Sequence, residues 1–250
     1  MASHNLQIRD KDGFSFHYRP GTADENQLDF PLDMFMIPEY RIWPHHVVVD
    51  VGGHIGTFAV PMAKKVPRGK VYSIEPGKES YSILEKNVLL NGLGNVSLHN
   101  LALTDYQGTA RLYHAPDNET WGDSITNPEG EAEEVRADTL ENFLEENNIE
   151  KVDFMKVNCE GAEFEIIQSS TKDTLSKISL LLILYHCDYN EGQTEQSMIE
   201  HLKEKGFRVW VREKEGERGW IIARNKKVFH LPTLRQVRFM MKNLIRKIVN

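Results

Sequence analysis

Residues 47–59 read VVVDVGGHIGTFA. Three β-branched residues predict a short buried strand, Asp50 closes it, and glycines follow at Gly52, Gly53 and Gly56. Apolar residues then recur at helical spacing, so the stretch predicts a strand–turn–helix unit. Such a unit brings a ligand against open backbone at the carboxyl edge of a parallel sheet, because a glycine has no side chain to hold the ligand away.

Two acidic residues indicate which ligand this turn binds. The pattern is D-x-G-G-x-x-G, not the nicotinamide pattern G-x-G-x-x-G, and a carboxylate directly before the turn suits an amino-acid ammonium better than a pyrophosphate. The next predicted strand, 70–75, ends in Glu75, where a carboxylate can accept hydrogen bonds from both ribose hydroxyls. Asp50 and Glu75 together predict S-adenosylmethionine (SAM) as the cofactor.

The composition is that of a globular protein with a core. Of the 250 residues, 40% are hydrophobic and 27% charged, and we expect one domain. No apolar run approaches the roughly 20 residues that span a membrane, and the first residues lack the pattern of a signal peptide. Two cysteines make no disulfide framework, which favours a reducing, cytoplasmic location.

Charge is distributed unevenly along the chain. The net charge is −7, but residues 226–250 carry seven basic residues and no acidic one, so the remaining residues carry −14. An acidic body argues against nucleic-acid binding, which needs a basic face. Apolar residues of the tail recur at helical spacing and predict a basic amphipathic helix. Its apolar side either packs on the chain's own core or a partner subunit, or attaches to anionic lipid.

Strand and helix patterns alternate along the chain. A hairpin is expected over 6–18, and a loop with a short helix over 20–45 forms a lid or an approach to the first core strand. We expect core strands at 47–51, 70–75, 95–99, 152–157, 178–185, 207–213 and 219–223. Helices are expected at 57–65, 78–91, 138–147, 161–170 and 194–205, and a polar, hairpin-containing excursion at 108–137.

This alternation predicts an α/β fold. Strands separated by helices form a parallel sheet covered on both faces, whereas the last two strands are joined by too few residues for a parallel crossover and must be antiparallel. The prediction is a doubly wound, seven-stranded, mostly parallel sheet with the last strand antiparallel. It divides the chain into an N-terminal hairpin and lid segment (1–45), a cofactor-binding core (46–225) and the tail (226–250).

With these segments placed, residues 14–225 resemble the FkbM family of SAM-dependent methyltransferases. Residues 50–56 match the family's D-V-G-A-N-x-G, with Gly53 and His54 in place of Ala and Asn, and 74–76 match its F-E-P. Further matches are Asn87 and Asn91, the stretch 101–108 with A-L-S-D-x-x-G, the stretch 138–140, and DFMKVNCEGAE at 153–163 with D-L-L-K-I-D-V-E-G-A-E.

The resemblance implies a Rossmann-like methyltransferase that methylates a hydroxyl of a sugar or natural product, with a small-molecule or glycan acceptor. The residues expected to bind the cofactor are Asp50, Gly52, Gly53, His54, Gly56, Thr57, Phe58, Glu75, Pro76, Leu101, Ala102, Asn158 and Cys159, with Tyr40 and Ser124 near its methionine part or the acceptor. The main departure is Asn158, where the family has Asp, because Asn cannot take a proton.

A hydroxyl acceptor needs a proton acceptor beside the transferred methyl, at the carboxyl ends of the strands. The predicted catalytic residues are His186, Glu160 and Lys156. Each has a simpler explanation: His186 as a hydrogen-bonded histidine at the core edge, Glu160 as a carboxylate favoured by a helix N-terminus, and Lys156 as an ion-pair residue. For Tyr40 and Ser124 the simpler explanations are a lid and a turn.

No metal site is expected. Cys159 and Cys187 follow the ends of neighbouring strands, but their spacing matches no zinc pattern and favours two reduced thiols. Two alternatives to a methyltransferase stay open. A nicotinamide-dependent oxidoreductase would need G-x-G-x-x-G and a catalytic Tyr/Lys pair, and a non-catalytic SAM-binding module would recruit a partner through the basic tail.

Overall fold

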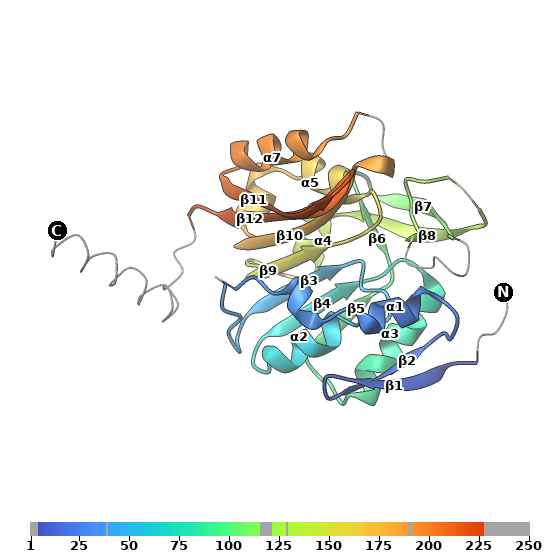
Figure 1. Ribbon diagram of the computed structural model, residues 1–250. Coiled ribbons are helices and arrows are strands. Elements are labelled where there is room, and N and C mark those ends of the chain that lie inside the picture. Colours follow the sequence, from blue (N-terminus) through green and yellow to red (C-terminus); the bar gives the residue numbers. More distant parts are fainter. Residues whose placement is uncertain (1–4, 39, 116–121, 129, 190–191, 228–250) are drawn as a thin grey trace.

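The computed structural model describes residues 5–38, 40–115, 122–128, 130–189 and 192–227. Its centre is a seven-stranded sheet with the order β11-β12-β10-β9-β3-β4-β5 (Figure 1). The strands are β3 (Val47–Val51), β4 (Lys70–Ile74), β5 (Val96–His99), β9 (Phe154–Val157), β10 (Leu180–His186), β11 (Phe207–Glu215) and β12 (Arg218–Asn225). Five of them run parallel, and β12 is antiparallel to both β10 and β11.

The predicted fold class is therefore confirmed. The reversed last strand lies between β10 and β11, one position in from the edge of the sheet. The strands are short runs of aliphatic residues because both faces of the sheet are buried. In β10, for example, six of the seven residues are buried.

Helices cover both faces of the sheet, and successive strand residues contribute to two separate cores (Figure 1). One core packs under α4 (Leu140–Glu146), α5 (Glu163–Ser169), α6 (Lys172–Ser176) and α7 (Glu195–Glu204). The other packs under α1 (Ala23–Asp29), α2 (Ala59–Lys65) and α3 (Lys78–Leu90). Helix α2 begins two residues later than predicted, and the predicted helix 161–170 is followed by the separate helix α6.

The predicted N-terminal hairpin is present as β1 (Gln7–Lys11) and β2 (Phe14–Tyr18). It is fixed to α3 by two asparagine side chains. Asn87 accepts a hydrogen bond from the backbone N–H of His17 at 2.6 Å and donates one to its carbonyl at 3.0 Å, and Asn91 bonds the backbone of Ser15 in the same way. The two asparagines of the family motif therefore hold the N-terminal segment.

The segment 20–45 differs from its prediction in detail. A helix was expected from Leu32 to Tyr40, but the α-helix lies earlier, at α1, and only a 3₁₀ turn, η1 (Leu32–Phe35), follows. Helix α1 begins after Thr22, whose side chain accepts a hydrogen bond from the N–H of Asp24. This N-cap is a local signal in the sequence, and it outweighs the weak apolar pattern farther on.

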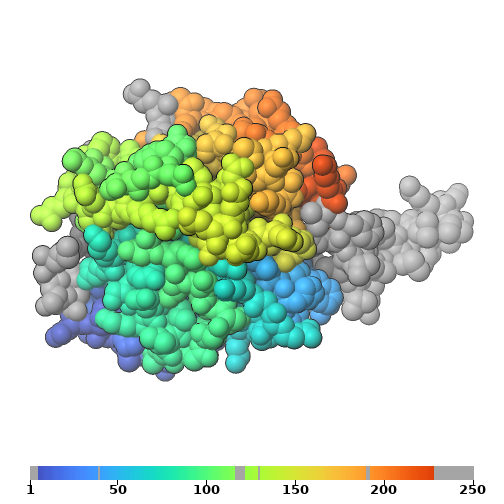
Figure 2. All heavy atoms as spheres, turned by 180° about the vertical axis from the view of Figure 1, so that it is seen from behind, coloured from blue at the N-terminus to red at the C-terminus, as the bar shows by residue number. Residues whose placement is uncertain are grey.

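The polar excursion forms a small sheet of its own, with the order β6-β8-β7. Its strands are β6 (Ala102–Thr104), β7 (Gly108–Tyr113) and β8 (Ala132–Thr139), of which β6 was not predicted. Seen from behind, in Figure 2, these green to yellow-green residues form a surface layer between α3 and the C-terminal third of the chain. Residues of β6 and β7 therefore stand beside the ends of β3 and β4.

Within the described residues, no helix has the length and apolar character needed to cross a membrane. The predicted amphipathic helix of the tail lies outside the described residues and stays a prediction.

Candidate active site

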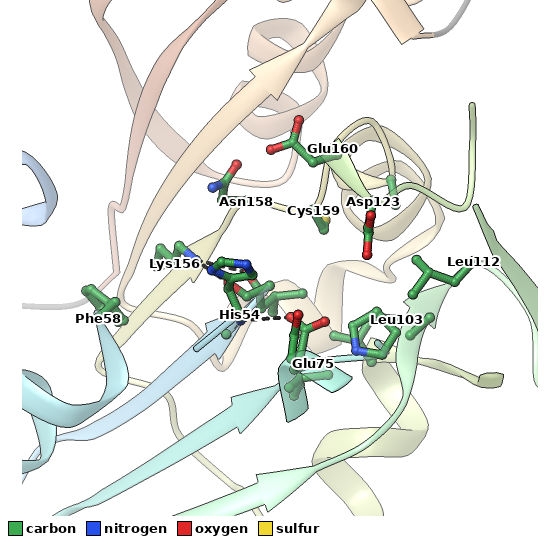
Figure 3. Close-up of a pocket in the computed structure, with 18 of the residues that line it drawn as sticks. His54, Phe58, Glu75, Leu103, Leu112, Asp123, Lys156, Asn158, Cys159 and Glu160 are labelled. Carbon is green, nitrogen blue, oxygen red and sulfur yellow. Dashed lines mark hydrogen bonds between the residues drawn. The ribbon is translucent and has the colours of Figure 1, made fainter. Parts of the chain in front are cut away.

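A cavity opens at the carboxyl ends of β3, β4 and β9, with about 870 Å³ of space not filled by atoms, its opening to solvent included. The turn after β3 contributes Gly52, Gly53, His54, Thr57 and Phe58, the end of β4 contributes Glu75 and Pro76, and the end of β9 contributes Lys156, Asn158, Cys159 and Glu160. Figure 3 shows these groups converging from three strands. Most of the residues predicted to bind the cofactor are thus brought together.

The glycine turn lets two strand ends approach closely. Gly52 has a φ of +77°, and a Cβ added there would lie 1.7 Å from the carbonyl oxygen of Asn158. The N–H groups of Gly52 and Gly53 both donate to the carbonyl of Ile74, at 3.0 and 2.9 Å. Because no other residue fits at 52, the turn joins the ends of β3, β4 and β9 with open backbone between them.

Asp50 and Lys156 form a buried ion pair behind this turn, with 3.0 Å between Lys156 Nζ and Asp50 Oδ1. The Lys156 ammonium also donates to the carbonyl of Gly52 at 2.7 Å, and Asp50 accepts from the hydroxyl of Ser73 at 3.0 Å. Asp50 is fully buried and does not line the cavity. Asp50 therefore faces Lys156 and not a ligand, which corrects its predicted contact with an ammonium. Lys156 lines the cavity as well as pairing with Asp50, and its catalytic role stays a prediction.

Glu75 has the position that the sequence predicts for a ribose-binding carboxylate. Its Oε2 accepts from the N–H of His54 at 2.8 Å and its Oε1 from the N–H of Gly77 at 2.9 Å. Burial raises the pKa of Glu75, although His54 and these backbone bonds oppose the shift. Each carboxylate oxygen keeps a second lone pair, so the group is fixed in place and still able to accept two hydroxyl hydrogens from a ligand.

Two buried polar atoms of cavity-lining residues have no hydrogen-bond partner within the described part of the chain. They are Nδ1 of His54 and Oδ1 of Asn158. In the view of Figure 3 the His54 ring lies between Lys156 and Glu75, with Asn158 above it. A buried polar atom without a partner is costly, so both atoms fit a site completed by the polar end of a ligand.

Glu160 reaches the cavity from a strained position. Its φ is +50°, which is uncommon for any residue but glycine, and its carbonyl accepts from the hydroxyl of Ser124 at 2.5 Å. Its carboxylate lies 3.3 Å from Nε2 of His186, whose Nδ1 lies 3.1 Å from Glu163. Burial raises the pKa of Glu160 to about 7 even though His186 opposes the shift. The Glu160 carboxyl therefore exchanges its proton near neutral pH.

His186 itself does not line the cavity, which corrects its predicted role as the base over the methyl group. Its side chain is 1% exposed, because β10 extends to residue 186 and places the ring beneath Glu160. Burial lowers the pKa of His186, but Glu163 and Glu160 outweigh burial and raise it overall. Glu163 is held in turn by the N–H groups of Cys159 and Gly161, at 2.7 and 2.9 Å. The ring therefore positions Glu160.

Two further predicted contacts are corrected. The Tyr40 hydroxyl donates to the carbonyl of Asp153 at 2.7 Å, at the start of β9 and thus at the edge of the sheet opposite the cavity. Ser124 is 1% exposed and holds the carbonyl of Glu160 in place of touching a ligand. Its neighbours Asp123 and Ile125 are the cavity-lining residues.

Some residues that line the cavity were not predicted as site residues. They are Gln27, Phe35, Val51, Ile74, Ser80, Leu103, Leu112, Asp123, Ile125 and Ala162. Asp123 accepts from the N–H of Ala115 at 2.9 Å and pairs with His114 at 3.0 Å, which fixes its carboxylate beside the apolar residues of the small sheet. Val51, Ile74 and Leu103 lie within the matched motifs, but no local pattern marks Gln27, Phe35 or Leu112, which reach the cavity only through the packing of the N-terminal segment and the small sheet.

Within the described ranges, no three His, Cys, Asp or Glu side chains are grouped so that they could hold a metal ion. Both cysteines are free thiols, and burial raises the pKa of Cys159 well above its usual value. Metal independence stays a prediction.

The strand order, the glycine turn and the acidic residue after the second strand together define a SAM-dependent methyltransferase. The sequence profile described as Methyltransferase FkbM domain matches residues 50–209. The chain therefore belongs to the FkbM methyltransferase family, and its cofactor is SAM. The predicted family and cofactor are confirmed, and the nicotinamide alternative is wrong.

Similar proteins include Methyltransferase 1 of Beauveria bassiana, 27% identical over 82% of this chain and 90% of that one. Methyltransferase sdnD of Sordaria araneosa is 25% identical over 48% of this chain and 59% of its own. The AMB antimetabolite synthetase AmbE of Pseudomonas aeruginosa is 24% identical over 68% of this chain but only 10% of its own.

Among solved structures, a Methanococcus jannaschii fibrillarin pre-rRNA processing protein has a TM-score of 0.50 with 12% identity, over 89% of this chain and 83% of that one. At this identity the likeness concerns the fold alone. A structure of M. jannaschii TYW2 in complex with AdoMet has a TM-score of 0.45 with 16% identity, over 89% of this chain and 86% of that one.

Proposed function

We propose that this methyltransferase methylates a hydroxyl group of a sugar or natural product, with Glu160 as the general base. The observation that carries the proposal is the Glu160 carboxylate, which lines the cavity with a pKa of about 7. SAM supplies an electrophilic methyl group when bound. A hydroxyl that attacks it must lose its proton, and a carboxylate that titrates near neutrality is suited to accept that proton.

Two other polar side chains at the end of β9 are less suited to this task. Lys156 is paired with Asp50, and Asn158 cannot take a proton. His186, which is held in turn by Glu163, contacts the Glu160 carboxylate and orients it before an acceptor arrives. Orientation matters because the attacking oxygen must lie in line with the breaking bond.

The wall supplied by the N-terminal segment suits a small acceptor. Phe35 and Phe58 pack edge to face with 5.3 Å between ring centroids, and Gln27 adds a polar group beside Thr57. The acidic body of the chain disfavours a nucleic-acid acceptor. One similar protein is named an antimetabolite synthetase, which supports a small-molecule product for this chain as well.

The test begins with methyl transfer from labelled SAM to a panel of glycosides and polyketide alcohols, with amines as the comparison. We expect product from a hydroxyl acceptor and a kcat that rises with pH through about 7, because Glu160 acts as a base only when it is ionised. Glu160→Gln should lower kcat by about 10²- to 10⁴-fold. The affinity for S-adenosylhomocysteine, measured by calorimetry, should stay within about twofold of wild type.

Transfer to amines in preference to hydroxyls would overturn the proposal, and so would a fully active Glu160→Gln variant. Tight cofactor binding with no transfer to any acceptor would favour the non-catalytic SAM-binding module.

A further inference from the structure

A buried ion pair of the N-terminal segment touches the cofactor site from outside the family domain, which begins at residue 50. Arg19 and Asp24 are 4% and 0% exposed. The guanidinium donates to both oxygens of Asp24, at 2.8 and 2.9 Å, and the N–H of Arg19 adds a third bond at 2.8 Å. Asp24 Oδ1 also lies 3.1 Å from Nε2 of His54. This carboxylate therefore connects α1 to the glycine turn.

The ion pair determines which nitrogen of His54 carries the proton. Burial alone would raise the pKa of Asp24, but the hydrogen bonds from His54 and Arg19 hold it well below its usual value. An ionised carboxylate only accepts hydrogen bonds, so Nε2 of His54 must donate. Arg19 also lies 3.3 Å from Nε2, and because both groups are donors this contact results from their sharing Asp24.

A histidine ring whose single proton is on Nε2 presents a lone pair at Nδ1. This is the buried atom without a partner in the described structure, on a residue that lines the cavity. The backbone N–H of the same residue holds Glu75, which is placed to take the ribose hydroxyls. The remaining strong donor near the ribose of SAM is the ammonium of its methionine part, because the carboxylate beside it cannot donate.

We propose that Asp24 is a positioning residue of the cofactor site: it fixes His54 with the proton on Nε2, so that Nδ1 accepts a hydrogen bond from the ammonium of SAM. The family motif has Asn at position 54. An asparagine side chain is shorter than histidine and has no ring, so it lacks the second nitrogen with which His54 reaches α1. In this chain a histidine at 54 and its partner Asp24 together make the N-terminal segment a part of the cofactor site.

The test compares two ligands that differ in the amino-acid part. S-Adenosylhomocysteine has the ammonium, whereas 5′-methylthioadenosine keeps the adenine and ribose and lacks it. At pH 8, His54→Ala should weaken the binding of S-adenosylhomocysteine about 10- to 100-fold and the binding of methylthioadenosine less than about twofold. Asp24→Asn should also weaken S-adenosylhomocysteine more than methylthioadenosine, with a smaller loss of S-adenosylhomocysteine affinity, about 3- to 30-fold.

Glu79→Gln is the matched control. It removes the other carboxylate that pairs with Arg19, 3.3 Å from its Nη1, and leaves His54 as it is. The affinities for both ligands should therefore stay unchanged. A second readout is nitrogen NMR of histidine-labelled protein. The free enzyme should show His54 with the proton on Nε2, and S-adenosylhomocysteine, but not methylthioadenosine, should shift its Nδ1 resonance. This measurement on wild-type protein needs no variant to fold.

If His54→Ala lost affinity for both ligands equally, the proposal would be overturned, because His54 would then have a structural or ribose-binding role. Wild-type affinity for S-adenosylhomocysteine in that variant, or a proton found on Nδ1, would overturn it too. None of these measurements involves an acceptor, so their outcome is independent of the proposed O-methylation.

Discussion

Glu160 combines two unfavourable features at one position. Its left-handed backbone costs on the order of 1–2 kcal/mol in a residue with a Cβ, and its carboxylate is only 12% exposed. The surrounding groups hold both features in place: Ser124 binds the carbonyl, and His186 binds the carboxylate. A strained, buried acid at the end of a strand is typical of a residue kept for its chemistry and not for stability.

This arrangement makes stability depend on pH. The pKa of Glu160 is about 7 in the folded chain and near 4.5 in an ordinary glutamate, so between these values the folded state binds the proton more tightly. The free energy of unfolding therefore falls as pH rises through this window, by about 3 kcal/mol. Glu160→Gln removes the titration, so its melting temperature should exceed that of wild type at pH 8 and approach it at pH 5.

Calorimetric melting of both proteins across this pH range measures the effect. Glu204→Gln, at an exposed position of α7, is the control and should melt like wild type at both pH values. An identical pH dependence of Glu160→Gln and wild type would contradict the assignment of this titration to Glu160.

At the scale of elements, the parallel register of β3 and β9 is what pairs Asp50 with Lys156. The sequence predicts both strands and their ends, because short aliphatic runs and the glycine turn are local signals. It does not predict which residues of two strands lie opposite each other. The sequence therefore leaves Lys156 between a catalytic role and an ion pair, and the register shows it as the counterion of Asp50 that also holds the carbonyl of Gly52.

A double-mutant cycle tests this pair. Lys156→Met leaves the Asp50 carboxylate buried without its cation and should cost about 3–5 kcal/mol of unfolding free energy. Asp50→Asn alone should also lower the unfolding free energy. The double variant should lose about 1–3 kcal/mol less unfolding free energy than the two single variants lose together. Urea denaturation gives these values.

Lys151→Met is the matched control for the cycle. Lys151 pairs with Asp153 just before β9, but its side chain is 59% exposed, so the loss should stay below about 1 kcal/mol. Strict additivity of the Asp50 and Lys156 substitutions would show that the two side chains do not interact.

At the scale of the whole molecule, the N-terminal segment belongs to the same packed unit as the cofactor-binding strands. Phe16, Leu28 and Phe35 are buried in one core with Val48 and Phe154. The hairpin, the succession of strands and helices along the chain and the cofactor turn were predictable because neighbouring residues specify them. The contributions of the N-terminal segment to the cavity were not, because they depend on contacts between residues far apart in the sequence.

The C-terminal tail gives the last prediction. The last strand of the sheet ends at Asn225, so the strands whose ends form the cavity all precede the tail. Deleting residues 232–250 should therefore leave the affinity for S-adenosylhomocysteine within about twofold of wild type. The deletion removes five of the seven basic residues of the tail, and each basic residue near an anionic surface contributes about 1 kcal/mol to membrane attachment.

Sedimentation with anionic and with neutral vesicles at low salt decides what the tail binds. Attachment of the full chain to anionic vesicles alone, lost on deletion and weakened by added salt, would support a lipid-binding tail, because salt screens exposed charges. If the full chain ignores both kinds of vesicle and the deletion lowers the melting temperature, the apolar side of the tail packs on its own core. A change from dimer to monomer on deletion would instead assign that side to a second subunit.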